Sequence, residues 1–214
     1  MLREIETRRS IRKFSEQEIS MEDIQDILES GIKAPSAKNR QPWKFVIVMG
    51  KEKEGMLEAF RRGIEREEKR EALLPESQRF LSGAKYTIQI MEQAPVSVFV
   101  LNSLGKGLFS SMNEEERIFE VCNIQSVSAA IQNMLLAAEH KGIGSLWICD
   151  IFLPMKRFVS GLAPRGAFSC GELRLPQRST ETQTAKRVGQ GGCMERWGLK
   201  EVKLWNTCFI IFWQ

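Results

Sequence analysis

The sequence predicts a single α/β or α+β domain, and two observations support this. The chain has 214 residues, of which 43% are hydrophobic, enough to bury one substantial core. Segments with helical spacing of apolar residues alternate with short apolar runs that are typical of buried strands. Because no repeat or low-complexity tract interrupts this alternation, we expect helices and a sheet to pack around one core.

The first predicted elements are a helix over residues 21–32 and a strand over residues 44–49. Apolar residues fall on one face of the helix, Ser20 and Asp23 form a capping-box-like start, and the helix should end before Pro35. The strand is the apolar, β-branched run KFVIVM, which indicates a buried strand. A loop therefore connects this helix to this strand.

The remaining predicted elements continue the alternation. Residues 51–72 show helical spacing on a heavily charged background, which indicates a surface helix. Residues 96–101 (VSVFVL) are predicted as a second strand, and residues 124–138 are apolar or small on nearly every face, which predicts a buried helix. After a glycine turn, residues 143–149 (IGSLWIC) are a third strand candidate.

The composition argues against several classes of function. The formal net charge is +4, but acidic and basic residues are interspersed as on an ordinary solvated surface, so nucleic-acid binding is not implied. The first ten residues lack an apolar signal-peptide core, and no stretch approaches the roughly 18 apolar residues of a membrane span, so we expect a cytoplasmic protein without a membrane partner. The five cysteines contain no C-x-x-C pair and are expected to be reduced thiols.

The scarcity of histidine and tyrosine limits the available chemistry. The chain has one histidine, His140, and one tyrosine, Tyr86, whereas a Ser-His-Asp triad or a multi-histidine metal site needs side chains of this kind. We interpret His140 as a surface residue at a helix end. Catalysis is therefore expected to depend on a cofactor, with no protein metal site.

Three motifs could contact a ligand. Residues 8–14 (RRSIRKF), which we call the arginine segment, suit a phosphate, although a basic helix end or exposed turn would have the same composition. Residues 34–43 (APSAKNRQPW), which we call the motif loop, are stiffened by Pro35 and Pro42 and present donors and acceptors suited to a flavin ring, although such turn residues also bond among themselves. Residues 132–147 run from a helix through a glycine turn into a strand, and their glycines allow close approach of a ligand or simply of a neighbouring segment.

In this order and at these separations, the three motifs resemble those of the FMN-dependent nitroreductase family. Its members carry R-R-S-x-R-x-F, then A-P-S-x-x-N-x-Q-P-W, and later A-A-x-Q-N-M-L-L-A-A-x-x-x-G-x-G-S, and the match covers roughly residues 1–151. The resemblance implies an α+β sandwich in a single domain, with a mixed, mainly antiparallel sheet flanked by helices. It also implies a homodimer with FMN at the interface, contacted by residues of both chains.

The resemblance further implies which residues bind FMN. The arginine segment is expected at the phosphate and ribityl end, the motif loop near the ring and in part from the partner chain, and the glycine turn as a source of backbone contacts. Arg12, or otherwise Lys38, is the candidate cation beside the N1 to C2 carbonyl side of the ring. The expected cofactor-binding residues are Arg8, Arg9, Ser10, Arg12, Pro35, Ser36, Ala37, Lys38, Asn39, Gln41, Gly144 and Ser145.

The chemistry implied by the resemblance takes place on the cofactor. Hydride from NADH or NADPH would pass to flavin N5 and then to a small electron-poor acceptor such as a nitroaromatic or quinone, in ping-pong turnover and without a catalytic residue of the protein. Family members also include dehalogenating and flavin-consuming enzymes, which these motifs do not separate. The alternatives are a catalytically impaired flavin-binding remnant and a non-enzymatic binding protein; if the basic residues bound nucleic acid, affinity would fall steeply with salt.

The last part of the chain departs from the family pattern. From about residue 152 to residue 214 the sequence lacks clear periodicity, and it includes the apolar run CFIIFW, which would promote aggregation if exposed. Codons for residues 153–161 and 165–175, read in a shifted frame, can encode family-like segments, so a frameshift is one hypothesis and a divergent tail is the other. We therefore divide the chain into a nitroreductase-like FMN-binding domain, residues 1–151, and an atypical tail, residues 152–214, out of frame or poorly ordered.

Overall fold

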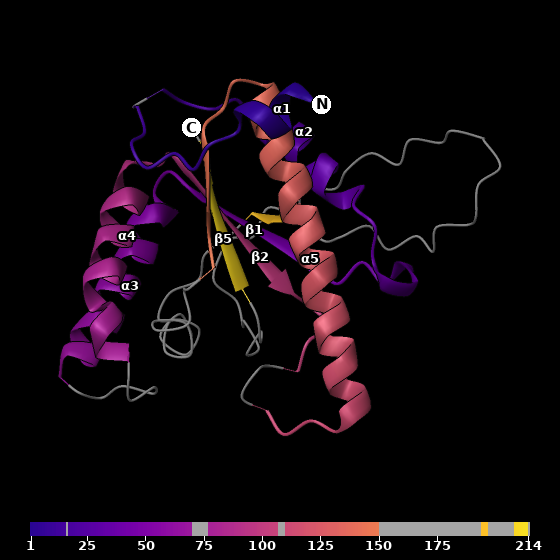
Figure 1. Ribbon diagram of the computed structural model, residues 1–214. Coiled ribbons are helices and arrows are strands. Elements are labelled where there is room, and N and C mark those ends of the chain that lie inside the picture. The colour runs from indigo at the N-terminus through magenta and orange to yellow at the C-terminus, as the bar shows by residue number, and fades with distance from the viewer. Residues whose placement is uncertain (16, 70–76, 107–109, 150–193, 197–207, 214) are drawn as a thin grey trace.

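A computed structural model describes residues 1–15, 17–69, 77–106, 110–149, 194–196 and 208–213. These residues form a five-stranded sheet with helices on both faces (Figure 1). The helices are α1 (Arg3–Thr7), α2 (Met21–Ile32), α3 (Glu52–Glu68), α4 (Leu81–Gln93) and α5 (Glu114–His140), with 3-10 turns η1 (Ala37–Asn39) and η2 (Ser77–Phe80). The strands are β1 (Trp43–Met49), β2 (Val96–Asn102), β3 (Ser145–Ile148), β4 (Met194–Arg196) and β5 (Cys208–Trp213).

The sheet is mixed and mainly antiparallel. Its strand order is β3-β5-β2-β1-β4. The pairs β1–β2, β2–β5 and β3–β5 are antiparallel, whereas β1–β4 is parallel. The expected α+β architecture, a mainly antiparallel sheet flanked by helices, is therefore confirmed in the part of the chain that the structure describes.

The alternation of side chains along β1 and β2 divides the core into two layers. Phe45 and Ile47 of β1 pack on the face covered by α2 and α5, whereas Val46 and Val48 pack on the face covered by α3 and α4. The strand β2 is buried along its whole length and alternates in the same way. Because both faces of these strands are covered, their sequences are continuous apolar runs rather than alternating ones.

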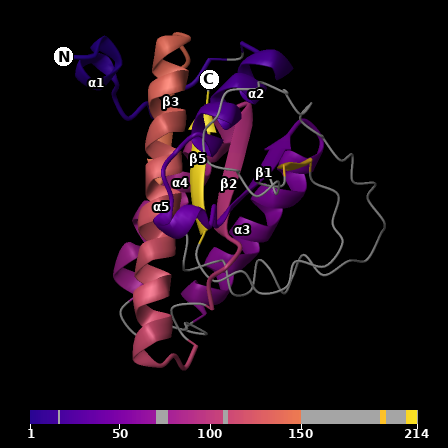
Figure 2. The same cartoon turned by 90° about the vertical axis from the view of Figure 1, so that its right-hand side faces the viewer.

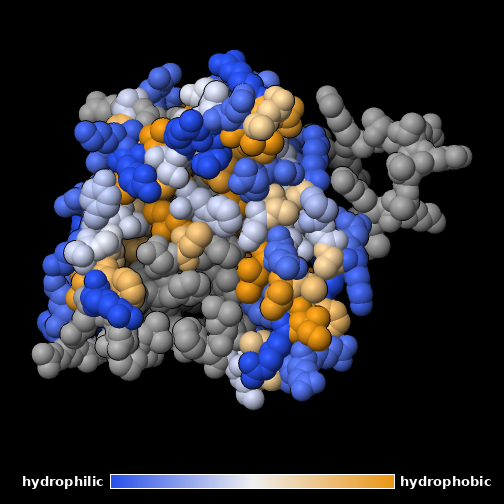
Figure 3. Space-filling view, viewed as in Figure 1, coloured by the Kyte–Doolittle hydropathy of each residue, from blue (hydrophilic) through white to orange (hydrophobic). Residues whose placement is uncertain are grey.

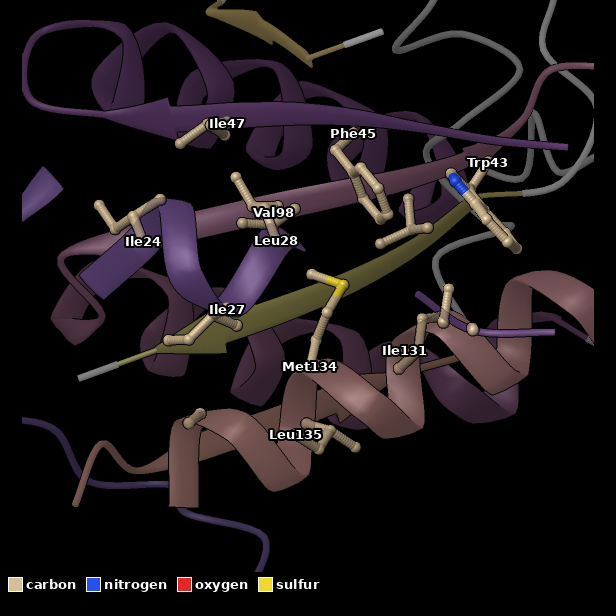
Figure 4. Close-up of a cluster of buried hydrophobic side chains, with 14 of the residues drawn as sticks. Ile24, Ile27, Leu28, Trp43, Phe45, Ile47, Val98, Ile131, Met134 and Leu135 are labelled. Atoms are coloured by element: carbon tan, nitrogen blue, oxygen red, sulfur yellow. The ribbon is translucent and has the colours of Figure 1, made fainter. Parts of the chain in front are cut away.

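Helix α2 packs tightly against α5 at Gly31. A Cβ at this position would lie 2.8 Å from Cγ and Sδ of Met134 and 3.3 Å from Cζ of Phe45. The absence of a side chain lets Met134 fill the space between the two helices and β1 (Figure 4). Asn133 Nδ2 of α5 also donates a hydrogen bond of 3.1 Å to the carbonyl of Ser30. These contacts fix the end of α2, from which the motif loop departs.

The helix α2 has the predicted bounds, whereas α5 is longer than predicted. Ser20 Oγ accepts a hydrogen bond from the backbone of Asp23 at 3.0 Å, and α2 spans the predicted residues. The buried helix is longer than predicted: α5 begins where Asn113 and Glu116 form a reciprocal capping box, well before residue 124. Its length makes α5 span the height of the described fold (Figure 2). The helices α1 and α4 were not predicted.

Two strands of the sheet come from the part of the chain expected to be an atypical tail. The strand β5 lies between β2 and β3, so the run CFIIFW occupies an inner position of the sheet, and β4 pairs with β1. The segments on which the frameshift hypothesis rests, residues 153–161 and 165–175, lie outside the described residues.

Of the helices that the structure describes, none is both long and apolar enough to cross a membrane.

Candidate functional site

The motif loop has a strained backbone. Three of its non-glycine residues, Lys38, Asn39 and Gln41, have positive φ angles of 53°, 54° and 47°. A residue with a Cβ is disfavoured in this left-handed region by about 1–2 kcal/mol, although asparagine tolerates it better than most. Such conformations persist only where the surrounding structure holds them, and they cluster at ligand-binding sites.

Hydrogen bonds within the loop and from α5 hold this conformation. Ser36 Oγ accepts a bond of 3.0 Å from Gln41 N, and Gln41 Nε2 donates a bond of 3.0 Å to Asn39 Oδ1. Ser126 Oγ of α5 accepts a bond of 3.2 Å from Ala37 N and donates one of 2.7 Å to a carbonyl one turn earlier in α5. Ser36, Asn39 and Gln41 of the loop were expected to bind the cofactor. In the structure, hydrogen bonds also connect Ser36 and Asn39 to Gln41.

Two cations of the motif loop lie over one aromatic ring of α5. Lys38 Nζ is 5.3 Å and Arg40 Cζ is 4.8 Å from the centre of the Phe119 ring. Within the described residues, neither cation has a carboxylate partner. Arg40 and Phe119 were not among the predicted site residues, because the family motif leaves the position of Arg40 unspecified and Phe119 lies outside every motif.

The arginine segment lies against the glycine turn. Ser10 pairs with Ser145 in a parallel bridge, and Ile11 N donates a hydrogen bond of 3.0 Å to the Ser145 carbonyl. A Cβ on Gly144 would lie 3.1 Å from Cγ1 of Ile11. The structure thus brings together two predicted clusters that are far apart in the sequence. The close approach at Gly144 serves this packing whether or not a ligand is bound.

The guanidinium groups of the arginine segment contact backbone oxygens. Arg9 Nη1 donates bonds of 2.7 and 3.0 Å to the carbonyls of Glu6 and Arg8, and Arg12 Nη1 donates a longer bond of 3.4 Å to the carbonyl of Ser10. In the described part of the chain, no carboxylate pairs with the three arginines of this segment. Among the described residues, the positive charge of the segment is thus not neutralised by a carboxylate contact, which suits an anionic ligand.

The two halves of the predicted site lie at different levels of α5. The motif loop is bonded to Ser126, whereas the arginine segment and glycine turn lie near the end of α5, where His140 Nδ1 is 2.8 Å from Glu4 Oε1 of α1 (Figure 1). Ser126 and His140 are 14 residues apart, which corresponds to a rise of about 21 Å along a helix. A single chain therefore does not gather all the predicted cofactor residues into one cluster.

The His140 side chain is 77% exposed at the last position of α5, which confirms its interpretation as a helix-end surface residue.

The N-terminal half of α5 exposes large apolar side chains. Ile118 is 63% exposed and Val121 is 54% exposed. Figure 3 shows apolar residues gathered over this half of the helix. Such a cluster on a surface helix is typical of a surface that another protein covers.

Comparison with known proteins places these features in a family. The model of the nitroreductase family matches residues 5–160, beyond residue 151, where the motif resemblance ended. Two archaeal proteins, both provisionally assigned as NADH dehydrogenase/NAD(P)H nitroreductase, are similar: the one from Archaeoglobus fulgidus is 34% identical over 148 residues, and the one from Methanothermobacter thermautotrophicus is 31% identical over 176 residues. These alignments cover 69% and 82% of the present chain, and 66% and 72% of the relatives. The chain thus spans just under two thirds of the first relative.

Solved structures show the same architecture. A provisionally assigned nitroreductase from Desulfovibrio desulfuricans, in complex with FMN, is 27% identical with a TM-score of 0.54, covering 75% of this chain and 74% of its own. A BluB-like flavoprotein from Clostridium difficile is 25% identical with a TM-score of 0.60, covering 86% of this chain and 93% of its own. With the family match over most of its length, the chain belongs to the nitroreductase family, a family of oxidoreductases.

Proposed function

We propose that the protein is an FMN-dependent oxidoreductase that transfers hydride from NADH or NADPH to a small electron-poor acceptor, such as a nitroaromatic or a quinone. The observation that carries the proposal is the motif loop, whose three left-handed residues are held in place by Ser126 and by each other. The FMN complex of the Desulfovibrio relative and the names of the archaeal relatives support the choice of cofactor and donor. When bound, the flavin would supply the redox chemistry through its N5 atom, in ping-pong turnover.

In this proposal the protein binds and orients the cofactor. The arginine segment fits a phosphate because its guanidinium groups have no carboxylate partner within the described residues. The motif loop fits a polar ring because its left-handed residues Lys38 and Asn39 are exposed. Lys38 and Arg12 are the candidate cations for the negative charge that reduction places on the ring. Gly144 and Ser145 would offer backbone contacts beside the arginine segment.

We further propose that the active form is a homodimer with FMN at the interface. The separation of about 21 Å along α5 between the two halves of the site supports this proposal, because a second chain would supply one half. The exposed Ile118 and Val121 lie on the half of α5 that also contacts the motif loop. In a two-fold dimer the same surface of both chains is covered, so the motif loop of one chain can face the arginine segment of the other.

The experiment is a titration of the purified protein with FMN, followed by absorbance and then by reduction with NAD(P)H. We expect about one flavin per chain, bleached on reduction. Arg12→Ala should weaken FMN binding about tenfold, the order of one charge-assisted hydrogen bond, whereas Arg62→Ala on α3, which removes only the surface pair with Glu58, is the matched control. A wild-type protein without a flavin spectrum would refute the proposed function, and equal affinity of the two variants would refute the role of Arg12.

The tail bears on whether the enzyme is fully active. We also propose that residues after 151 arise from a shifted reading frame. Such a shift would remove family contacts to FMN and to the partner chain, and it would leave a flavin-binding remnant. The nucleotide sequence of the gene tests this directly. Stop codons, or segments unlike the family, in the shifted frames would exclude it.

A further inference from the structure

A buried polar cluster lies where β2 ends, outside the residues assigned to FMN. The Asn102 side chain is 0% exposed, and Glu120 of α5 is 4% exposed. Asn102 Nδ2 donates a hydrogen bond of 3.1 Å to Glu120 Oε1, and Lys106 N donates one of 3.1 Å to Glu120 Oε2. Asn102 Oδ1 accepts a bond of 3.3 Å from Leu104 N. Both oxygens of Glu120 and the Asn102 amide thus hold one short segment, Asn102–Lys106, which we call the β2 turn.

Gly105 is required for this arrangement. Its backbone N–H closes the turn with a bond of 3.3 Å to the Asn102 carbonyl. A Cβ at this position would lie 2.5 Å from Asn102 Nδ2 and 2.9 Å from Glu120 Oε1, closer than non-bonded atoms approach. A residue with a side chain would therefore push the carboxylate away from the turn.

The β2 turn is also attached to the motif loop. Ser103 donates two hydrogen bonds to the carbonyl of Pro42, one of 2.7 Å from its backbone N and one of 2.8 Å from Oγ. On α5, the residue next to Glu120 is Phe119, whose ring lies under the two cations of the motif loop. One turn of α5 therefore holds the motif loop through Phe119 and the β2 turn through Glu120.

We propose that Glu120 is a positioning residue that fixes the β2 turn against the motif loop and thereby shapes the acceptor side of the site. This inference rests on the proposed function, because the motif loop is the segment expected beside the flavin ring. A buried carboxylate is stable only when its oxygens accept hydrogen bonds, so breaking the bonds to Asn102 and Lys106 is costly and the cluster resists displacement. The arginine segment of the same chain lies near the far end of α5, so a shift of the β2 turn acts on the ring and acceptor side through the motif loop and does not act directly on that segment.

The variant Glu120→Gln tests the role of the carboxylate. Glutamine has one acceptor oxygen, so either Asn102 Nδ2 or Lys106 N would face an N–H₂ group instead of an oxygen. We expect hydrogen exchange at the amides of Leu104 and Lys106 to become about tenfold faster, and the KM for a quinone acceptor to rise about tenfold, the order expected from one lost bond to a charged group. The kcat should change much less, and the affinity for FMN should fall by a smaller factor than the KM rises, because Glu120 contacts the motif loop only through the β2 turn. Glu115→Gln, an exposed position on the same helix, is the matched control.

The double variant Asn102→Asp/Glu120→Gln distinguishes this role from general loss of packing. It exchanges donor and acceptor between the two side chains and can keep the three hydrogen bonds described above. We therefore expect it to restore both the exchange rates and the KM, and it carries the test if Glu120→Gln alone does not fold. Gly105→Ala should reproduce the effect of Glu120→Gln.

Four results would overturn the inference. Unchanged exchange in Glu120→Gln would show that the carboxylate does not hold the turn. Faster exchange with unchanged KM would separate the turn from the acceptor site while the proposed function stands. A double variant that restores neither quantity would show that general loss of packing, and not the hydrogen bonds of the carboxylate, causes the effect. A wild-type protein that takes up no FMN would refute the proposed function itself and, with it, any role in acceptor binding.

Discussion

Two substitutions at Lys38 separate the effect of its left-handed backbone on stability from the effect of its side chain. Lys38 has φ 53° and ψ 25°. Lys38→Ala removes the ammonium group above Phe119, a contact of about 0.5–1 kcal/mol, but keeps a Cβ in the disfavoured region. Lys38→Gly removes the same group and also the backbone strain of about 1–2 kcal/mol, part of which is offset by the greater entropy of an unfolded chain with glycine. We therefore expect Lys38→Ala to be less stable than the wild type by about 1 kcal/mol and Lys38→Gly to regain about 1 kcal/mol relative to Lys38→Ala.

Urea unfolding followed by circular dichroism measures these differences, which correspond to Tm shifts of about 2–4 °C for a chain of this size. The exposed Lys33, at the C-cap of α2 with φ −78°, is the matched control, because there Ala should be more stable than Gly and the sign reverses. FMN affinity should be lower in Lys38→Gly than in Lys38→Ala, although both lack the ammonium group, since a flexible loop must be ordered on binding. Equal stability of the Ala and Gly variants at Lys38, or equal FMN affinity of these two variants, would refute the reasoning.

Three further predictions concern the contacts of α2 and the motif loop with α5 and its C-cap. Gly31→Ala should lower the free energy of unfolding by about 1–2 kcal/mol, because overpacking against Met134 outweighs the gain in helix propensity; an unchanged Tm would contradict the close helix crossing. Ser126→Ala should weaken FMN binding severalfold with a stability loss of about 1 kcal/mol, since it removes the hydrogen bond to the loop backbone; calorimetric titration with FMN would show it. The hydrogen bond from Lys141 lowers the pKa of Asp23 from 3.8, so this contribution to stability is complete above that pH and is lost as the pH falls through the lower folded pKa. Asp23→Asn should accordingly flatten the acid limb of the Tm–pH curve, and an identical acid limb in the variant would exclude this pair as its cause.

The sequence predicts the parts of the fold where one periodicity dominates. The strands β1 and β2 are buried on both faces, so their runs of apolar residues stand out, and α2 has both a clear cap and a single apolar face. The first turns of α5 escape detection because they combine glutamates with exposed apolar residues such as Ile118, so no stripe facing the core exists there. The helix α4 is missed because its fully buried residues, Ile88, Ile90 and Met91, are confined to its last turns.

The candidate site is predictable only as a set of segments. The motifs identify the motif loop and the arginine segment, but the pairing of Ser10 with Ser145 joins residues that no local pattern connects. The same holds for Gly105 and Glu120, whose close approach depends on where β2 ends relative to α5. Contacts of this kind arise from tertiary packing, which propensity and spacing do not encode.

The inner position of β5 has a consequence for the kinetics of folding. Its partners in β2 are distant in the chain, since Leu101 pairs with Cys208, 107 positions later. Closing so long a loop is entropically costly before any pairing is gained, so the sheet should be completed late and slowly. Until β5 docks, β2 and β3 present open apolar edges that can pair with other chains. The yield of folded protein should therefore depend on protein concentration during refolding more strongly than the stability of the finished fold would suggest.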